Sequence, residues 1–184
     1  MARTESAMLP LGTAAPDFAL MDVTSGKQVT LQSARGPHGL LVMFLCTHCP
    51  FVKHLETALA QLGRDYAGKG VGIVAIGSND AVAYPDDSPE GLTRQARRLG
   101  FNFAYLYDET QEVARAYCAA CTPDFFLFDN TLKLVYLGQF DASRPGNEIP
   151  VTGRDLRAAL DAVIAGLPVS HDQHPGLGCS IKWK

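Results

Sequence analysis

The chain has 184 residues, of which 47% are hydrophobic and 19% are charged, and its formal net charge at pH 7 is −3. This length and apolar content are typical of one globular domain with a sizeable core, which excludes a disordered or fibrous protein. The chain has no long basic run, so we expect no nucleic-acid partner. The longest apolar run, residues 39–46, is too short to span a bilayer, and the N-terminus lacks an apolar secretory segment. We therefore expect a cytoplasmic protein with no membrane partner, whose cysteines stay mostly reduced.

The first half of the chain predicts a hairpin, a buried strand and a helix. After an irregular lead-in at residues 1–15, residues 18–23 and 27–31 flank a turn and predict the hairpin. Residues 39–46 are a continuous apolar run, typical of a strand buried on both faces. From Pro50, apolar residues recur at three- and four-residue steps, which predicts an amphipathic helix that ends near Gly68.

The second half of the chain continues this alternation. We predict strands at 71–78 and 103–108 and a hairpin at 124–140 turned at Asp129–Asn130. We also predict a helix through Leu99 that Ser88 caps, with Pro89 at its first position, and a short helix at 110–118. A last helix is predicted to begin at Thr152, with a weak capping box to Asp155. Residues 167–184 predict an irregular tail. The order of elements predicts a single α/β domain, residues 1–184 with a core at about 9–166, in which helices cover both faces of a mixed sheet.

The stretch Phe44–His54, "FLCTHCPFVKH", lies where the buried strand meets the amphipathic helix. Catalytic groups of such sheets lie at the carboxyl ends of the strands, and a helix N-terminus stabilises a thiolate. Two intervening residues allow Cys46 and Cys49 to form a reversible disulfide, and a protonated His48 adds a positive charge between them. The pattern predicts a redox dithiol in which Cys46 attacks, Cys49 resolves and the pKa of Cys46 lies below about 8.5.

Two alternatives to a redox dithiol stay open at this point. Cysteine is often a small buried core residue, although the strand-to-helix position argues against that for this pair. A second C-x-x-C, Cys118 and Cys121, combines with the first into a possible four-cysteine zinc site. Because a core of this size folds without a metal, we expect no metal and no other cofactor.

Several segments together resemble the thioredoxin superfamily, and more narrowly the peroxiredoxin-like proteins of its alkyl hydroperoxide reductase/thiol-specific antioxidant branch. The residues that carry the resemblance are "GTAAPDFALMDVTSGKQVTL", "CTHCPFVKH", "SNDAVAYPDDSPEG", "CTPDFFLFD" and "GCSIKWK". The resemblance covers about residues 9–165 and implies a thioredoxin-like fold with an N-terminal hairpin.

The resemblance implies roles for residues outside the first motif. It implies that Pro123 is a cis-proline and that Thr122-Pro123 lies beside Cys46 and forms part of the substrate site. Cys121, one residue earlier, is then a candidate third redox thiol, and so is Cys179 in the tail, which either folds over its own active site or over a partner subunit's.

The chain also departs from a peroxiredoxin. In the alignment on Cys49, Cys46 stands where the motif has Thr and Val42 stands where it has Pro. This departure disfavours an efficient peroxidase. We therefore predict a thiol–disulfide oxidoreductase that acts on protein or small-molecule disulfides, with a peroxiredoxin-like peroxidase and a zinc-binding or redox-sensor protein as alternatives. Whether the chain forms a homodimer stays open.

Overall fold

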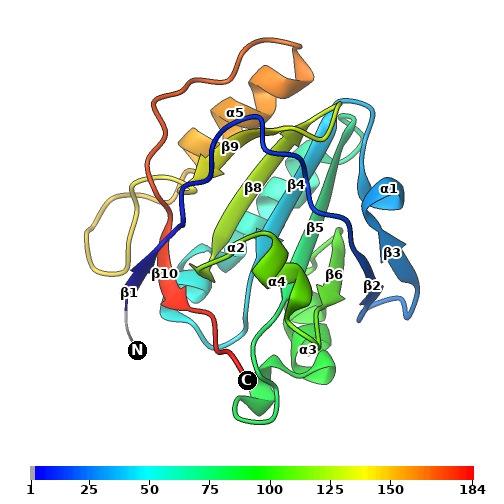
Figure 1. Ribbon diagram of the computed structural model, residues 1–184. Helices are drawn as coiled ribbons and strands as arrows, with labels where there is room; N and C mark the ends of the chain where they lie inside the picture. Colours follow the sequence, from blue (N-terminus) through cyan, green and yellow to red (C-terminus); the bar gives the residue numbers. More distant parts are fainter. Residues whose placement is uncertain (1–2) are drawn as a thin grey trace.

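A computed structural model describes residues 3–184; residues 1 and 2 of the predicted lead-in lie outside the described residues. A seven-stranded sheet of order β3-β2-β6-β5-β4-β8-β9 forms the centre, and a small three-stranded sheet of order β1-β10-β7 lies beside it (Figure 1). The strands are β1 (Arg3–Glu5), β2 (Ala19–Asp22), β3 (Gln28–Thr30), β4 (Gly39–Phe44), β5 (Val71–Gly77), β6 (Ala104–Tyr107), β7 (Cys121–Thr122), β8 (Asp124–Asp129), β9 (Leu134–Gly138) and β10 (Leu177–Ser180).

Strand β4 lies in the middle of the large sheet, and all six of its residues are buried. It pairs in parallel with β5 and antiparallel with β8. This position explains the continuous apolar run in the sequence, because helices cover the strand on both faces. The sheet is therefore mixed, as the order of elements predicts.

The helices cover the large sheet on both faces. They are α1 (Leu31–Ala34), α2 (Pro50–Tyr66), α3 (Pro89–Leu99), α4 (Glu112–Ala116) and α5 (Arg154–Ile164), with a single 3-10 turn, η1 (Pro85–Asp87), before α3. Apolar residues of α2, α3 and α5 share one core cluster, and those of α1 and α4 share the other. The structure thus confirms the predicted α/β fold with helices on both sides of the sheet.

Some elements differ from the prediction. The last helix begins at Arg154 after Gly153 in the left-handed region, and its N-cap makes no side-chain hydrogen bond, so the predicted start at Thr152 is wrong. Helix α1 was not predicted; Thr30 and Ser33 form its capping box. The predicted irregular tail contains β10, which lies beside β1 (Figure 1).

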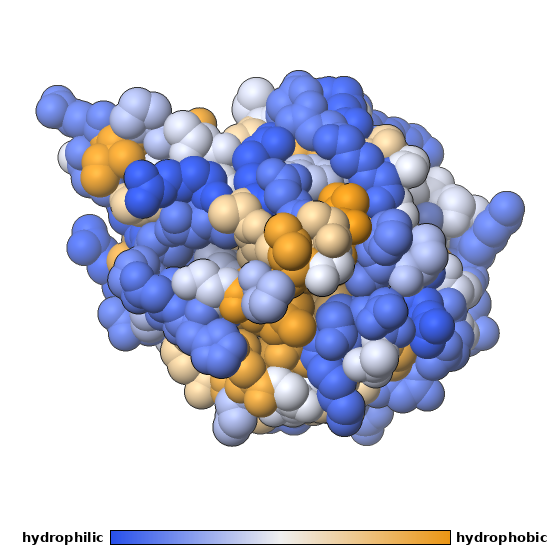
Figure 2. Space-filling view, turned by 90° about the horizontal axis from the view of Figure 1, so that it is seen from above, coloured by the Kyte–Doolittle hydropathy of each residue, from blue (hydrophilic) through white to orange (hydrophobic). Residues whose placement is uncertain are grey.

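Figure 2 looks down on the end of the large sheet where β4 begins, and an apolar area there is surrounded by hydrophilic side chains. The dithiol lies at the other end, after β4. In residues 3–184, every helix is too short or too polar to cross a membrane.

Candidate active site

Cys46 and Cys49 lie where β4 ends and α2 begins. Cys46 follows the strand, and Cys49 is the N-cap of α2, with Pro50 as the first helical residue. Both cysteines are buried: 1% of Cys46 and 0% of Cys49 is exposed. The pair therefore lies at the carboxyl end of the central strand and at a helix N-terminus, where the field of the helix favours negative charge.

The loop before β8 faces the dithiol. The Thr122–Pro123 peptide bond is cis, as the resemblance implied. The Thr122 hydroxyl lies 3.1 Å from the Cys46 sulfur, and the carbonyl oxygen of Thr122 lies 3.1 Å from the Cys49 sulfur. One residue thus presents a hydrogen-bond donor to Cys46 and an acceptor to Cys49.

The pKa values of the two thiols are shifted in opposite directions, so one negative charge rests mainly on Cys49. A hydrogen bond from Cys46 is the main cause that lowers the pKa of Cys49 to about 5. Hydrogen bonds from Cys179 and from the backbone N–H groups of Phe51 and Val52 act in the same direction, and burial opposes them. The hydrogen bond to Cys49 and burial raise the pKa of Cys46 well above that of an ordinary thiol. This order of pKa values is the reverse of the one that the sequence predicts, because the helix N–H groups and two neighbouring thiols converge on Cys49.

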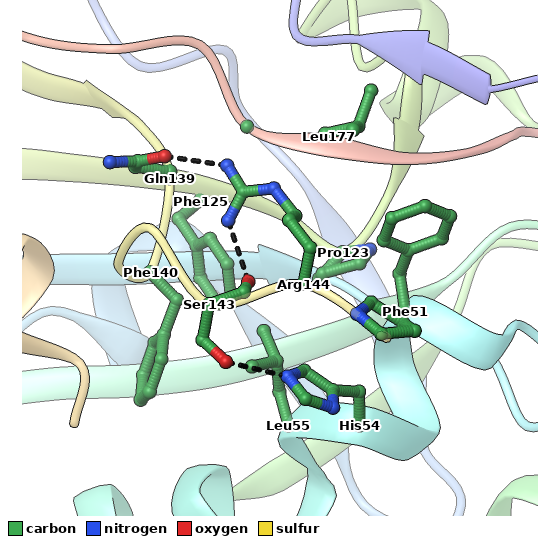
Figure 3. A pocket seen from close by; sticks show the side chains of 12 residues that line it. Phe51, His54, Leu55, Pro123, Phe125, Gln139, Phe140, Ser143, Arg144 and Leu177 are labelled. Atoms are coloured by element: carbon green, nitrogen blue, oxygen red, sulfur yellow. Dashed lines mark hydrogen bonds between the residues drawn. The ribbon is translucent and has the colours of Figure 1, made fainter. Parts of the chain in front are cut away.

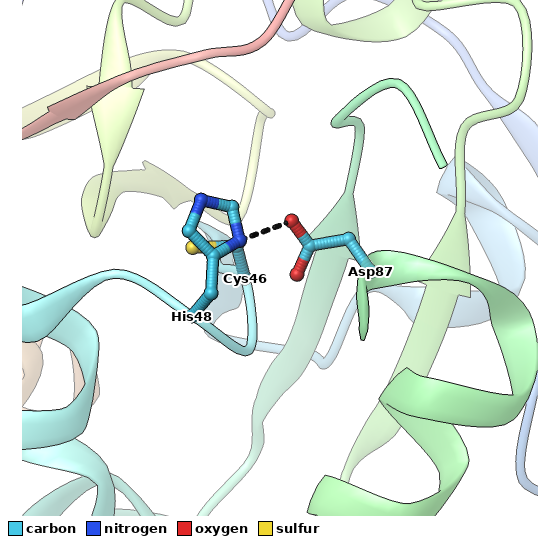
Figure 4. A group of neighbouring side chains, drawn as sticks. All are labelled: Cys46, His48 and Asp87. Atoms are coloured by element: carbon cyan, nitrogen blue, oxygen red, sulfur yellow. Dashed lines mark ion pairs between the residues drawn. The ribbon is translucent and has the colours of Figure 1, made fainter. Parts of the chain in front are cut away.

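His48 lies beside Cys46 and pairs with a buried carboxylate (Figure 4). Its Nδ1 lies 2.7 Å from Oδ2 of Asp87, whose side chain is 1% exposed. The contact with Asp87 raises the pKa of His48 despite partial burial. Nε2 of His48 is buried without a hydrogen-bond partner in the protein, and the ring stacks on Tyr84 at a centroid distance of 5.2 Å. The imidazole therefore keeps one nitrogen available for a proton.

Asp87 is a candidate site residue that sequence reasoning missed. Its Oδ1 accepts hydrogen bonds of 2.7 Å from both the backbone N–H and the hydroxyl of Thr47, and its Oδ2 accepts one of 2.7 Å from Asn79. Burial opposes ionisation, but these bonds and His48 hold the pKa of Asp87 below its usual value. The carboxylate thus ties the loop between the cysteines to the loop after β5, and the "PDDSPEG" segment was the only sequence signal for it.

A second buried carboxylate, Asp124, follows the cis-proline. It accepts hydrogen bonds from the Ser6 hydroxyl at 2.6 Å and from the backbone N–H of Ala120 at 3.2 Å. Burial raises its pKa to about 6. These contacts tie the N-terminal segment to the loop that faces the dithiol.

The second C-x-x-C pair does not join the first. Cys118 is exposed, whereas Cys121 is buried and its thiol donates to the carbonyl of Pro123 at 3.6 Å. Among residues 3–184, the only group of at least three potential metal ligands that lie within 4.8 Å of one another is Cys46, His48 and Asp87. The four-cysteine zinc arrangement that the sequence allowed is therefore wrong, because its ligands do not converge.

Cys179 lies against the dithiol. Its sulfur is 2.8 Å from that of Cys49, and all three cysteines are buried. Strand β10 places it there by pairing with β7, with Cys179 opposite Thr122. The tail therefore folds over the active site of its own chain.

A small pocket opens beside the cis-proline (Figure 3). Phe51 from the first turn of α2, Pro123 and Leu177 of β10 line one side of it, and Phe125 and Phe140 lie deeper. His54, one turn into α2, contacts the Ser143 hydroxyl at 2.7 Å. The pocket is small, and polar groups of Gln139, Ser143 and Arg144 line it together with these apolar side chains.

The fold and the site define a thioredoxin-like protein with a buried dithiol at a helix N-terminus, opposite a cis-proline. The model of the AhpC/TSA family matches residues 11–137, and the chain belongs to this family. Thiol-disulfide oxidoreductase ResA of Geobacillus thermodenitrificans is 30% identical over 131 residues, which are 71% of this chain and 70% of that protein.

Two solved structures match along nearly the whole chain. A crystal structure of an uncharacterized conserved protein from Geobacillus kaustophilus is 57% identical, with a TM-score of 0.98, and the match covers 100% of this chain and 97% of that one. A hypothetical protein from Sinorhizobium meliloti is 50% identical with a TM-score of 0.96, covering 98% of both chains. A putative thiol:disulfide interchange protein DsbE from Chlorobium tepidum, 22% identical with a TM-score of 0.66, covers 85% of this chain and 99% of that one and shares the fold. The protein is a thiol–disulfide oxidoreductase enzyme of thioredoxin-like fold.

Proposed function

We propose that Cys46 and Cys49 form the working dithiol and that the enzyme reduces disulfides of proteins or of small thiols. The observation that carries this proposal is the contact of both sulfurs with Thr122, beside the cis-proline and at the N-terminus of α2. The activity named for the ResA relative supports the same chemistry. The pocket beside Pro123 supports a substrate that approaches along Phe51 and Leu177.

The proton between the two sulfurs allows either one to carry the charge. With the proton on Cys46, the charge rests on Cys49 and is stabilised by the helix N–H groups. With the proton on Cys49, the Cys49 thiol donates to the Thr122 carbonyl, and the Thr122 hydroxyl donates to a Cys46 thiolate. We propose that the second form attacks, because in it the nucleophilic charge is on Cys46, whose sulfur lies beside the Thr122 hydroxyl next to the cis-proline.

The steps that follow balance with the groups present. Cys46 attacks one sulfur of the substrate disulfide, and a mixed disulfide forms as the substrate's other sulfur leaves as a thiolate. His48, protonated and paired with Asp87, supplies a proton to that thiolate from Nε2. Cys49 then attacks Cys46, the second substrate thiol leaves, and the enzyme holds a Cys46–Cys49 disulfide.

Reduction of insulin disulfides tests this proposal. We expect the wild type to accelerate insulin precipitation in the presence of dithiothreitol and Cys46→Ser to fall to the uncatalysed background. Cys118→Ser is the matched control, because Cys118 is exposed and lies outside the site. A Cys46→Ser variant that keeps the wild-type rate would reject Cys46 as the attacking residue.

A peroxidase is the second candidate, and the low pKa of Cys49 at the N-cap of α2 favours it. In this reaction the Cys49 thiolate attacks hydrogen peroxide, one oxygen is transferred to give a sulfenic acid, and water leaves after protonation. Stopped-flow consumption of peroxide separates the candidates. A rate no higher than that of free cysteine removes the peroxidase and leaves the reductase.

A further inference from the structure

Cys179 is separated from Cys49 by 130 positions in the chain, yet their sulfurs lie 2.8 Å apart. A covalent S–S bond is about 2.05 Å long, so the two sulfurs lie within an ångström of bonding distance. Neither Cys118 nor Cys121 has such a contact: the first is exposed, and the thiol of the second is bonded to a carbonyl. Of the three cysteines outside the C-T-H-C motif, only Cys179 contacts the dithiol.

Strand pairing holds Cys179 in register. Strand β10 lies between β1 and β7, with Cys179 opposite Arg3 on one side and Thr122 on the other. The backbones approach closely at Gly178, where a Cβ would lie 2.1 Å from the carbonyl oxygen of Thr122. Only glycine at position 178 allows the two backbones to lie this close. The close pairing of β10 with β7 holds Cys179, the next residue, beside the dithiol.

The residues after Cys179 anchor the tail to the active-site loops. The backbone N–H of Lys182 donates to Asn79 at 2.8 Å, and its carbonyl accepts from the backbone N–H of Asp80 at 2.8 Å. Asn79 is also the residue that donates to Asp87. Ile181 is buried, and Arg115 lies over the ring of Trp183. The chain is thus held on both sides of Cys179.

We propose that Cys179 is a third redox cysteine, which forms an intramolecular disulfide with Cys49 and closes the tail over the site. This proposal rests on the proposed function, because the disulfide substrate supplies the oxidation. The Cys179 thiolate attacks the Cys49 sulfur of the Cys46–Cys49 disulfide. The Cys49–Cys179 bond forms, the Cys46–Cys49 bond breaks, and Cys46 leaves as a thiolate that accepts the proton released by Cys179.

Oxidation of the dithiol lowers the pKa of Cys179 before the exchange, which is the direction that the reaction requires. In the reduced protein, burial and then hydrogen bonding to Cys49 raise the pKa of Cys179 to about 12. Oxidation of Cys49 removes its hydrogen bond and its charge, so the pKa of Cys179 falls when its target sulfur becomes reactive. After the exchange, Cys46 is free again beside Thr122, while β10 is covalently attached to α2.

Tryptic mapping tests the proposal on the full chain. Cys46 and Cys49 lie on one peptide, residues 36–53, Cys179 lies on residues 158–182, and Cys118 and Cys121 lie on residues 116–133. Reduced protein is treated with one equivalent of oxidised glutathione per chain, blocked with iodoacetamide and digested without reduction. We expect peptide 36–53 joined to 158–182 in the wild type and, in larger amount, in Cys46→Ser, whose Cys49 has no other partner in the motif.

The variants identify the sulfur that Cys179 joins. The joined peptide disappears in Cys49→Ser and in Cys179→Ser, and it persists in Cys118→Ser. Its absence from both the wild type and Cys46→Ser, or its persistence in Cys49→Ser, would overturn the assignment. Insulin reduction measured on the same samples distinguishes the two proposals. Insulin reduction without a joined peptide rejects the Cys49–Cys179 disulfide and leaves the reductase. A joined peptide without insulin reduction rejects the reductase and supports the Cys179 contact.

Discussion

The two C-x-x-C pairs of this chain have the same spacing and different surroundings. Cys46 and Cys49 lie between a central strand and the N-terminus of a long helix, and both are buried beside Thr122. Cys118 follows a short helix in the left-handed region, with φ of 52°, and is exposed, whereas Cys121 lies in β7 and is buried. Spacing alone therefore does not make a dithiol; the strand-to-helix junction that brings both sulfurs to one helix terminus does.

Replacement of the second cysteine in each pair gives the largest expected contrast. In Cys49→Ser, the mixed disulfide on Cys46 has lost its resolving thiol, so the enzyme accumulates as an adduct with glutathione after oxidation. Cys121→Ser retains the Cys46–Cys49 pair, so it releases the glutathione as the internal disulfide forms and carries no adduct. Intact-protein mass spectrometry reads the difference as one glutathione added or none. An adduct in Cys121→Ser alone would reverse the roles of the pairs.

The two pairs also differ in the pH at which they ionise. Cys49 has a pKa of about 5, whereas burial raises the pKa of Cys121 far above the ordinary thiol range. Absorbance at 240 nm is expected to rise by one thiolate around pH 5 in the wild type and in Cys121→Ser. In Cys46→Ala, loss of the side chain that donates to Cys49 moves this step to higher pH. A first step at or above about 8.5 in the wild type would contradict the site's electrostatics.

The same pKa predicts how stability depends on pH. The folded pKa of Cys49 lies below the unfolded value of about 8.5. The thiolate's stabilisation is therefore complete above that unfolded value and is lost as pH falls to about 5. Urea unfolding of the reduced protein at several pH values, with Cys49→Ser as the reference, measures this contribution. Parallel curves for the two proteins between pH 5 and 8.5 would contradict the lowered pKa.

Asp87 marks a further difference, because the first pair has a buried ion pair beside it. Asp87→Asn removes the charge that raises the pKa of His48, so His48 loses its proton at lower pH. We expect insulin reduction at pH 7 to fall on the order of tenfold, less than the 100-fold or more typical of removing a general acid outright. Nuclear magnetic resonance titration of the imidazole distinguishes this effect from misfolding. An unchanged His48 pKa would remove Asp87 from the mechanism.

The smallest expected effect concerns the strand that covers the first pair. Gly178→Ala places a Cβ against the Thr122 carbonyl and moves β10 away from β7. We expect Cys49 to react severalfold faster with iodoacetamide, while the rate at the exposed Cys118 stays the same and serves as an internal control. Equal rates at Cys49 in variant and wild type would show that β10 does not shield it.

Local patterns predicted the parts of the site that are close in sequence. The buried run of β4, Pro50 and the apolar spacing of α2 were sufficient to place Cys46 and Cys49 at a strand-to-helix junction. Asp87 was not predicted, because the hydrogen bond that joins it to Thr47 spans 40 residues of chain and originates in a loop. The resemblance offered Cys179 as a redox candidate but did not place its sulfur, since β10 is four residues long and exists only through its pairing with β1 and β7.

The position of the disulfide formed in turnover shows whether the first C-x-x-C pair is the working dithiol. The enzyme is mixed with insulin, quenched with acid, alkylated and digested with trypsin. We expect oxidised cysteines on peptide 36–53, as an internal disulfide or joined to 158–182, and alkylated Cys118 and Cys121 on peptide 116–133. An internal disulfide on 116–133 with Cys46 and Cys49 both alkylated would contradict it.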